Sequence, residues 1–306
     1  MTKQTQMTKQ TQMTRQAQMM EHVLKRMNLK ETVDFIHPKR AKERKLPTAS
    51  SKNYVTNSYD VEGFKYATIA PIQNHTQYHI VFFHGGGYSH EGSPRHFHWV
   101  KKYLETGKFT VSFINYPLAP ENTAEKTIDI AIKCYEHISK DPAGQRFVLM
   151  GDSAGGGLAL AIAMELRNRK MAMPIKTVLF SPWLDIDLKN PLIENYQSMD
   201  YVLSVTKLRE IGAIYRQGFD PTDFHVSPLY GDFDHLGELA IFYGTKEIFC
   251  PDCSMICNKT NLTGTQLTRF EYENMQHDWV LLPLPEAEKA IHESIDYMLT
   301  NHQHIT

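Results

Sequence analysis

Short apolar runs alternate with longer segments of helical periodicity through most of the chain. Between residues 53 and 83, three runs rich in β-branched and aromatic residues predict strands: NYVTNSY, FKYATIA and YHIVFF. Further predicted strands are FTVSFIN, RFVLM, TVLFS, LAIFYG and LTRFEY, and predicted helices cover about 95–106, 122–139, 154–169, a stretch from about Asp252, and 285–300. This alternation predicts an α/β protein with a mostly parallel central sheet and helices on both faces.

Two segments fall outside this alternation. Residues 1–18 repeat a six-residue unit as MTKQTQ, MTKQTQ and MTRQAQ, a low-complexity pattern that predicts disorder. A helix is expected from Met20 onward, because Met20, Leu24 and Met27 have helical spacing. Residues 191–218 add an extra helical stretch to the body of the chain, which we expect to cover residues 51–306.

Composition and charge narrow the function classes. The hydrophobic share of 42% over 306 residues is enough for a core, and the absence of a long apolar run argues against stable membrane insertion. Residues 1–52 hold 12 Lys/Arg against 4 Asp/Glu, whereas the remainder holds 21 against 30. Because basic residues in a terminal segment are usually only solvated, we expect no nucleic-acid partner. Monomer and homodimer both remain open.

The N-terminal segment and the cysteines bear on location. The segment has no continuous apolar stretch of the kind that a secretory signal requires, and four cysteines in 306 residues agree with a reducing compartment. We therefore expect a cytoplasmic protein. Cys250, Cys253 and Cys257 are closely spaced, but no second C-x2-C accompanies them, so we expect ordinary packing and no metal site.

The segment VLMGDSAGGGLALAIAMEL carries the strongest chemical signal. Its Gly151-x-Ser153-x-Gly155 pattern lies between a predicted strand and a predicted helix, which is the context of a nucleophile elbow. Side chains at 151 and 155 would collide in so sharp a turn, and the turn exposes the Ser153 hydroxyl at the end of the sheet. A serine hydroxyl becomes a nucleophile only when a base takes its proton and an acid holds that base in one tautomer.

The acid and then the base are expected downstream of Ser153. Of the fifteen histidines, His277 in YENMQHDWVLLP lies in the loop between the last predicted strand and the last predicted helix, where the base is needed. Glu247 and Asp252 both follow the strand LAIFYG. We prefer Glu247 as the acid, because it lies just past the strand end, whereas Asp252 has the position of a helix N-cap.

A second glycine run, at residues 84–87, follows the strand YHIVFF. An acyl-transfer serine needs backbone N–H donors for the oxyanion, one from the residue after the nucleophile, Ala154, and others from such a loop. A phosphate-binding loop is the weaker reading, because the chain has neither G-x4-G-K-[ST] nor a G-x-G-x-x-G followed by a ribose-binding acid.

Other polar and aromatic residues near these motifs have less specific predictions. Asp152 and Glu121 are expected to be structural hydrogen-bonding groups. Residues that follow strand ends or the glycine run are candidates to line a substrate pocket or its mouth: Trp183, Asp185, Tyr88, His90 and Glu91.

Together, HGGGYSHEG, YPLAPEN, GDSAGGGLAL and MQHDW resemble the hormone-sensitive-lipase-like branch of the α/β-hydrolase carboxylesterases, over about residues 55–300. The resemblance implies an α/β-hydrolase fold with a small helical cap, which matches residues 19–50 and the insertion at 191–218. It also implies roles for individual residues: Ser153 as nucleophile, His277 as base, and the amides of Gly86, Gly87 and Ala154 as the oxyanion hole, with Gly85 in the same loop. One departure is Glu247, where the family mostly has aspartate.

The expected function is therefore that of a serine carboxylesterase that hydrolyses short-to-medium acyl esters of small molecules without metal or cofactor. An amidase, an arylformamidase or a deacetylase on the same triad remains an alternative. A non-catalytic ligand-binding protein on this scaffold is a second alternative, against which the presence of Ser153, Glu247 and His277 argues.

Overall fold

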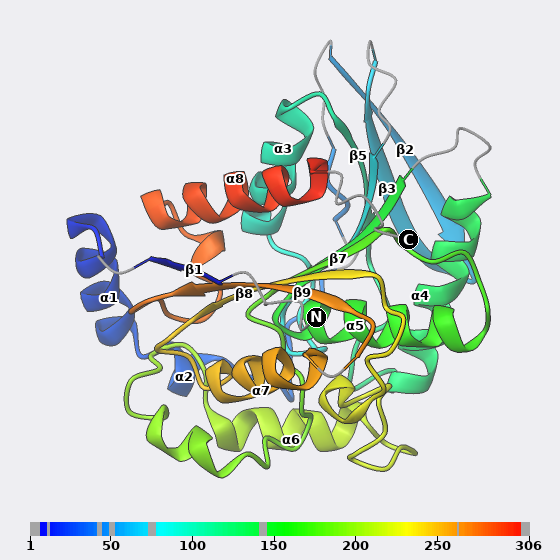
Figure 1. The fold of residues 1–306 in the computed structure, drawn as a ribbon. Helices are drawn as coiled ribbons and strands as arrows, with labels where there is room; N and C mark the ends of the chain where they lie inside the picture. The colour runs from blue at the N-terminus through cyan, green and yellow to red at the C-terminus, as the bar shows by residue number, and fades with distance from the viewer. Residues whose placement is uncertain are drawn as a thin grey trace.

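A single mixed sheet runs through the molecule (Figure 1). The computed structural model describes residues 7–10, 13–41, 45–48, 53–72, 78–140, 146–261 and 263–300. The strands are β1 (Met7–Gln10), β2 (Tyr54–Val61), β3 (Phe64–Pro71), β4 (Tyr78–Phe83), β5 (Phe109–Ile114), β6 (Arg146–Asp152), β7 (Lys176–Phe180), β8 (Glu238–Gly244) and β9 (Gln266–Tyr272). Their order is β1-β9-β8-β7-β6-β4-β5-β3-β2. Neighbouring strands from β1 to β5 in this order are parallel, and β3 and β2 are joined antiparallel at one edge. The predicted α/β class is confirmed.

Helices cover both faces of the sheet. They are α1 (Arg15–Met27), α2 (Leu29–Thr32), α3 (Pro94–Glu105), α4 (Ala124–Ser139), α5 (Ser153–Asn168), α6 (Val205–Tyr215), α7 (Cys250–Thr260) and α8 (Pro285–Leu299). One apolar core contains residues of α4, α5, α6 and α7, and the other contains residues of α1, α3 and α8 (Figure 1). Within the described ranges, no helix combines the length and the apolar character needed to cross a bilayer.

The sequence pattern of each strand follows its position in the sheet. All six residues of β4 and of β5 are buried, which suits strands covered on both faces and explains their mostly apolar sequences. The edge strand β2 is mostly exposed and correspondingly polar. Because the carboxyl ends of β4, β6, β8 and β9 lie at the same edge of this parallel region, the loops that follow them can meet.

The N-terminal segment is more ordered than its low complexity predicted. Residues 7–10 form β1, which pairs with β9 so that Met7 lies opposite Arg269. Helix α1 begins at Arg15, because the side chain of Thr14 accepts the N–H of Ala17 at 3.2 Å and so caps the helix. Strand β1 and the first four residues of α1 fall in the stretch 1–18 for which disorder was predicted, whereas the rest of α1 lies beyond it. Residues 1–6 and 11–12 lie outside the described residues.

The N-terminal helices contact the insertion after β7, although the two are far apart in sequence. Nζ of Lys207, on α6, donates to the carbonyl oxygens of Glu31 at 2.5 Å and Val33 at 3.0 Å. Nζ of Lys30 donates to the carbonyl oxygen of Gln197 at 3.4 Å. In Figure 1, α2 and α6 accordingly lie near one another on one side of the sheet. A two-part cap built from residues 19–50 and 191–218 requires such contacts.

Candidate active site

Ser153 lies at the sharp junction between β6 and α5. Its φ of +51° places a non-glycine residue in the left-handed region, a strained conformation that concentrates at functional sites. A Cβ atom on Gly151 would collide with the carbonyl oxygen of Gly155, and a Cβ atom on Gly155 would collide with that of Phe83. The two glycines are therefore required by the turn, as the sequence predicted for a nucleophile elbow.

His277 and Glu247 complete a hydrogen-bonded chain with Ser153. Nε2 of His277 lies 3.0 Å from Oγ of Ser153, and Nδ1 lies 2.7 Å from Oε2 of Glu247. The other carboxylate oxygen of Glu247 accepts the N–H of Gly244 at 2.8 Å and the hydroxyl of Ser181 at 3.1 Å. An ionised carboxylate can only accept, so beside ionised Glu247 the neutral imidazole carries its proton on Nδ1 and Nε2 can accept from the serine. In the imidazolium both ring nitrogens carry a proton.

The charge balance around His277 favours the imidazolium. Burial by itself lowers the pKa of His277, but the carboxylates of Asp278 and Glu247 more than offset it, so the pKa is raised well above its ordinary value. Oδ2 of Asp278 lies 3.1 Å from Nε2, on the same side of the ring as Ser153. Sequence analysis did not single out Asp278, although its position directly after His277 is a signal that was available.

Asp252 lies elsewhere and has a different role from the one predicted. It is in the first turn of α7 and is not its N-cap, because the helix begins at Cys250 and Phe249 holds the cap position. Its Oδ1 accepts from Nδ2 of Asn190 at 2.8 Å. Burial raises the pKa of Asp252 to about 7, with the Asn190 hydrogen bond opposing the shift. Glu247, and not Asp252, is the carboxylate hydrogen-bonded to His277.

The glycine loop after β4 is tied to the nucleophile elbow through Asp152. Oδ1 of Asp152 accepts the N–H of Gly85 at 3.0 Å, and Oδ2 lies 3.0 Å from Nε2 of His96. Burial lowers the pKa of His96, but the Asp152 carboxylate outweighs it and the net shift is upward, which favours the charged form of His96. Asp152 therefore has the structural role predicted for it, and the N–H of Gly85 is used within the protein.

The loop then exposes backbone in conformations that favour glycine. Gly86 and Gly87 have φ values of +122° and +61°. The amide of Ala154, in the first turn of α5, needs no partner within its helix. Gly86, Gly87 and Ala154 are thus left as the candidate oxyanion donors, while Gly85 anchors the loop.

The three predicted pocket residues are all buried, but they differ in character. Tyr88 stacks on Tyr215 of α6 with ring centroids 3.8 Å apart and lies 5.6 Å from the Trp183 ring, so these rings join the glycine loop to the insertion. Asp185 accepts two backbone N–H groups of its own loop, at 2.8 and 3.0 Å, and the hydroxyl of Tyr230 at 2.9 Å. Its carboxylate therefore holds that loop in shape, and the pocket-lining role stays a prediction.

Glu121 forms an ion pair, and the three closely spaced cysteines are packed in the core. Glu121 pairs with Arg40, whose Nη2 lies 2.6 Å from Oε2. The thiols of Cys250, Cys253 and Cys257 are buried on α7 within the core, and burial raises the pKa of Cys257 to about 11.

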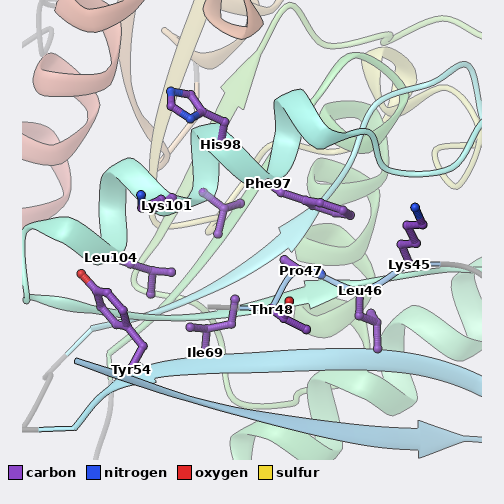
Figure 2. A pocket seen from close by; sticks show the side chains of 11 residues that line it. Lys45, Leu46, Pro47, Thr48, Tyr54, Ile69, Phe97, His98, Lys101 and Leu104 are labelled. Atoms are coloured by element: carbon purple, nitrogen blue, oxygen red, sulfur yellow. The ribbon is translucent and has the colours of Figure 1, made fainter. Parts of the chain in front are cut away.

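A separate cavity of about 660 Å³ lies on the α3 side of the sheet (Figure 2). None of the predicted site residues lines it. Its walls come from residues 45–48, β2, β3 and α3, namely Lys45, Leu46, Pro47, Thr48, Tyr54, Ile69, Phe97, His98, Val100, Lys101 and Leu104.

Comparisons with known proteins identify the family and the fold. A family model described as alpha/beta hydrolase fold matches residues 80–281, a span that contains Ser153, Glu247 and His277. An acetyl-hydrolase of Streptomyces hygroscopicus is 30% identical over 217 residues, which cover 69% of this chain and 72% of the relative. An esterase of Acinetobacter venetianus is 27% identical over 222 residues, covering 71% and 73%. The solved structure of a hormone-sensitive lipase from a metagenome library superposes with a TM-score of 0.79 at 24% identity, covering 92% of this chain and 96% of that one, so the two share a fold.

Proposed function

The chain belongs to the alpha/beta hydrolase fold family, and from this we propose that it is a serine carboxylesterase that cleaves short-to-medium acyl esters through an acyl-enzyme. The family is one of serine ester hydrolases, and the resemblance to its hormone-sensitive-lipase-like branch is confirmed by the relatives named acetyl-hydrolase and esterase. The observation that carries the proposal is the continuous hydrogen-bonded chain from Oγ of Ser153 through His277 to Glu247.

The geometry supports acylation by general base catalysis. Oγ of Ser153 attacks the ester carbonyl carbon while Nε2 of His277, at 3.0 Å, takes the hydroxyl proton. Glu247 accepts the Nδ1 proton at 2.7 Å, which fixes the tautomer and stabilises the imidazolium. The tetrahedral oxyanion is held by backbone N–H groups, and each such donor contributes roughly 2.7 to 4 kcal/mol in related sites. We assign that role to Gly86, Gly87 and Ala154.

Collapse of the intermediate and deacylation use the same groups. The imidazolium of His277 gives its proton to the departing alkoxide, which leaves the acyl group on Ser153. A water molecule then attacks the acyl carbonyl while Nε2 takes one of its protons, and the second tetrahedral intermediate expels Ser153 with that proton returned to Oγ. In these reaction steps, His277 transfers the protons, and the backbone amides stabilise the negative charge on the carbonyl oxygen.

Contacts of the N-terminal segment support a restricted acyl site. The ring of Phe35 lies against Gly87, since a Cβ on that glycine would collide with it, and it makes an edge contact with the ring of His90 at 5.2 Å. Because Gly87 belongs to the proposed oxyanion loop, Phe35 is placed close to the reacting carbonyl. We propose that residues 19–50 and the insertion at 191–218 act together as a cap that limits acyl length.

A cytoplasmic location is part of the proposal. The four cysteines are free thiols, and all are buried, which agrees with a reducing compartment.

The test is hydrolysis of p-nitrophenyl esters of increasing acyl length, beside the matching p-nitroanilides, by the full chain. We expect turnover of the shorter esters, little or no anilide cleavage, and loss of turnover in Ser153→Ala. Ester hydrolysis that survives Ser153→Ala would exclude the proposed nucleophile, and preference for the anilides would identify an amidase.

A further inference from the structure

One turn of the insertion is hydrogen-bonded to the loop that carries Glu247. The side chain of Asp200 is fully buried, and its Oδ2 accepts the N–H of Ile248, the residue after Glu247, at 2.9 Å. Its Oδ1 accepts the N–H groups of Val202 at 2.8 Å and Leu203 at 2.9 Å. One carboxylate oxygen thus shapes the turn of the insertion, and the other holds the backbone beside the triad acid.

The same turn is hydrogen-bonded to the loop that carries His277. Gln276, the residue before His277, accepts the N–H of Tyr201 at its Oε1 at 2.9 Å. Its Nε2 donates to the carbonyl oxygen of Met199, also at 2.9 Å. The amide of Gln276 is therefore paired with the backbone on both sides of Asp200, and one short segment contacts the two loops that must place the acid and the base.

We propose that residues 199–203, here called the strut, set the positions of Glu247 and His277 relative to Ser153, with Asp200 and Gln276 as positioning residues. This rests on the proposed function, because only a working triad requires such placement. Three backbone N–H groups donate to the buried side chain of Asp200, and hydrogen bonds are stronger in such a low-dielectric surrounding, so they hold the loop firmly. Glutamate also has one more rotatable bond than aspartate, and so a Glu acid gains more from a fixed loop.

The alternative is that the strut only stabilises the fold, and a double-mutant cycle separates the two roles. Asp200→Asn keeps the shape of the side chain but places an amide NH2 where an acceptor is required. If Asp200 acts through the acid and base, its substitution loses its effect on kcat once Glu247→Gln has already removed the carboxylate. If it acts only on stability, the two effects on kcat are independent.

The experiment measures kcat and KM on one short p-nitrophenyl ester, together with thermal melts, for the wild type, both single variants and the double variant. We expect Asp200→Asn to lower kcat roughly 10- to 100-fold with little change in KM, since a displacement of about 1 Å can cost about 100-fold. In the Glu247→Gln background the further loss should be less than about 3-fold. Equal losses in both backgrounds would overturn the proposal.

Two further variants provide an independent test and a control. Gln276→Met removes both hydrogen bonds to the strut at similar side-chain length, and its cycle with His277→Ala should be equally non-additive, because Gln276 acts on the loop of the base. This cycle decides the question if Asp200→Asn fails to fold. Asp223→Asn is the matched control, because Asp223 accepts the N–H of His225 in its own loop at 2.9 Å, and its kcat should equal that of the wild type. A wild type without ester hydrolysis contradicts the proposed function, whereas an active wild type with additive cycles contradicts only the strut.

Discussion

The carboxylate of Asp278 lies 3.1 Å from Nε2 of His277, the ring nitrogen that also lies 3.0 Å from Oγ of Ser153. One nitrogen therefore faces both the nucleophile and an acid. A carboxylate in that position stabilises the imidazolium, in which Nε2 carries a proton and cannot act as a base. Other charged groups whose fields reach this pair come from several elements: Glu247, Asp200, Asp152 and His96.

Asp278→Asn should make the enzyme active at lower pH. The pKa of His277 is raised in the folded protein, and the free base that accepts the serine proton exists only above that pKa. Removing the Asp278 charge lowers the pKa of His277, so the acid limb of the kcat/KM profile should move to lower pH. At high pH, kcat should fall, because the imidazolium formed in the transition state loses a stabilising partner.

The pH profiles of the two enzymes should therefore cross. Asp129→Asn, which removes a carboxylate that pairs with Lys133 on the surface of α4, is the control and should leave the limb in place. Superimposable profiles for Asp278→Asn and the wild type would show that Glu247 alone sets the pKa of His277.

Ser153 should react once, and irreversibly, with a fluorophosphonate probe. The hydrogen bond to His277 makes its oxygen nucleophilic, whereas ordinary serines remain inert. Ser153→Ala should abolish labelling and lower kcat by a factor on the order of 10⁶, as in other triads. Intact-mass and peptide mass spectrometry give the stoichiometry and the position, and a label on any other residue in the folded protein would move the nucleophile elsewhere.

The residues of the proposed triad could be singled out from the sequence because each has a local signal. Ser153 lies between a strand and a helix in a glycine pattern that the turn requires, and His277 and Glu247 each follow a strand of a parallel sheet. Strand direction alone then brings the three loops to one edge. Glu247 was preferred over Asp252 only because of its position just past the strand end. The further prediction that Asp252 is the N-cap of α7 was wrong. Pro251 lies in the first turn of that helix, and a proline there is a sequence signal for an earlier helix start.

Two features of the structure could not be predicted, because each is a contact between segments that are distant in the sequence. The contact of Asp200 with the Glu247 loop has no local signal, because its partner Ile248 is 48 residues away and offers only a backbone N–H. Strand β1 is a polar repeat whose sequence predicts no strand, and it forms along the free edge of β9 through backbone pairing. A single sequence contains no pattern that records either contact, because the information lies in the assembled sheet and not in the segment itself.

Glu247→Gln should lower the activity, whereas Asp252→Asn should change the stability. Glu247→Gln should lower kcat roughly 10²- to 10⁴-fold with folding intact, because the amide no longer secures the tautomer of His277. Asp252→Asn should have near-normal turnover. It should also be more stable than the wild type above neutral pH, because burial raises the pKa of Asp252 from 3.8 to about 7.

The sign of that stability change follows from linkage. A buried carboxyl with a raised pKa keeps its proton in the folded state but loses it in the unfolded state, so the wild type loses stability as pH rises from about 4 to about 7. An asparagine removes this loss and can still accept from Asn190. Thermal melts at pH 5 and pH 8 should show a gain of a few degrees at the higher pH and a smaller one at the lower pH. Inactive but folded Asp252→Asn, with full turnover in Glu247→Gln, would assign the acid role to Asp252.

Phe35 should restrict the length of the acyl group. Its ring lies against Gly87 of the proposed oxyanion loop, and it is held there by a segment that is hydrogen-bonded to α6 through Lys207. Phe35→Ala removes the ring and opens space beside the reacting carbonyl. The ratio of kcat/KM for p-nitrophenyl hexanoate to that for the acetate should rise roughly 10-fold or more, since a methylene in an apolar pocket is worth roughly 1 to 3 kcal/mol.

The control for this change is another aromatic at the edge of the same core. Phe219 is partly buried against the core cluster that Phe35 also contacts, but its ring lies beside His225, at 5.4 Å, and not beside the glycine loop. Phe219→Ala should therefore lower stability without altering the chain-length ratio. If both substitutions leave the ratio unchanged, or both raise it equally, the acyl group does not lie under Phe35, and the N-terminal segment would cover the sheet without shaping the substrate site.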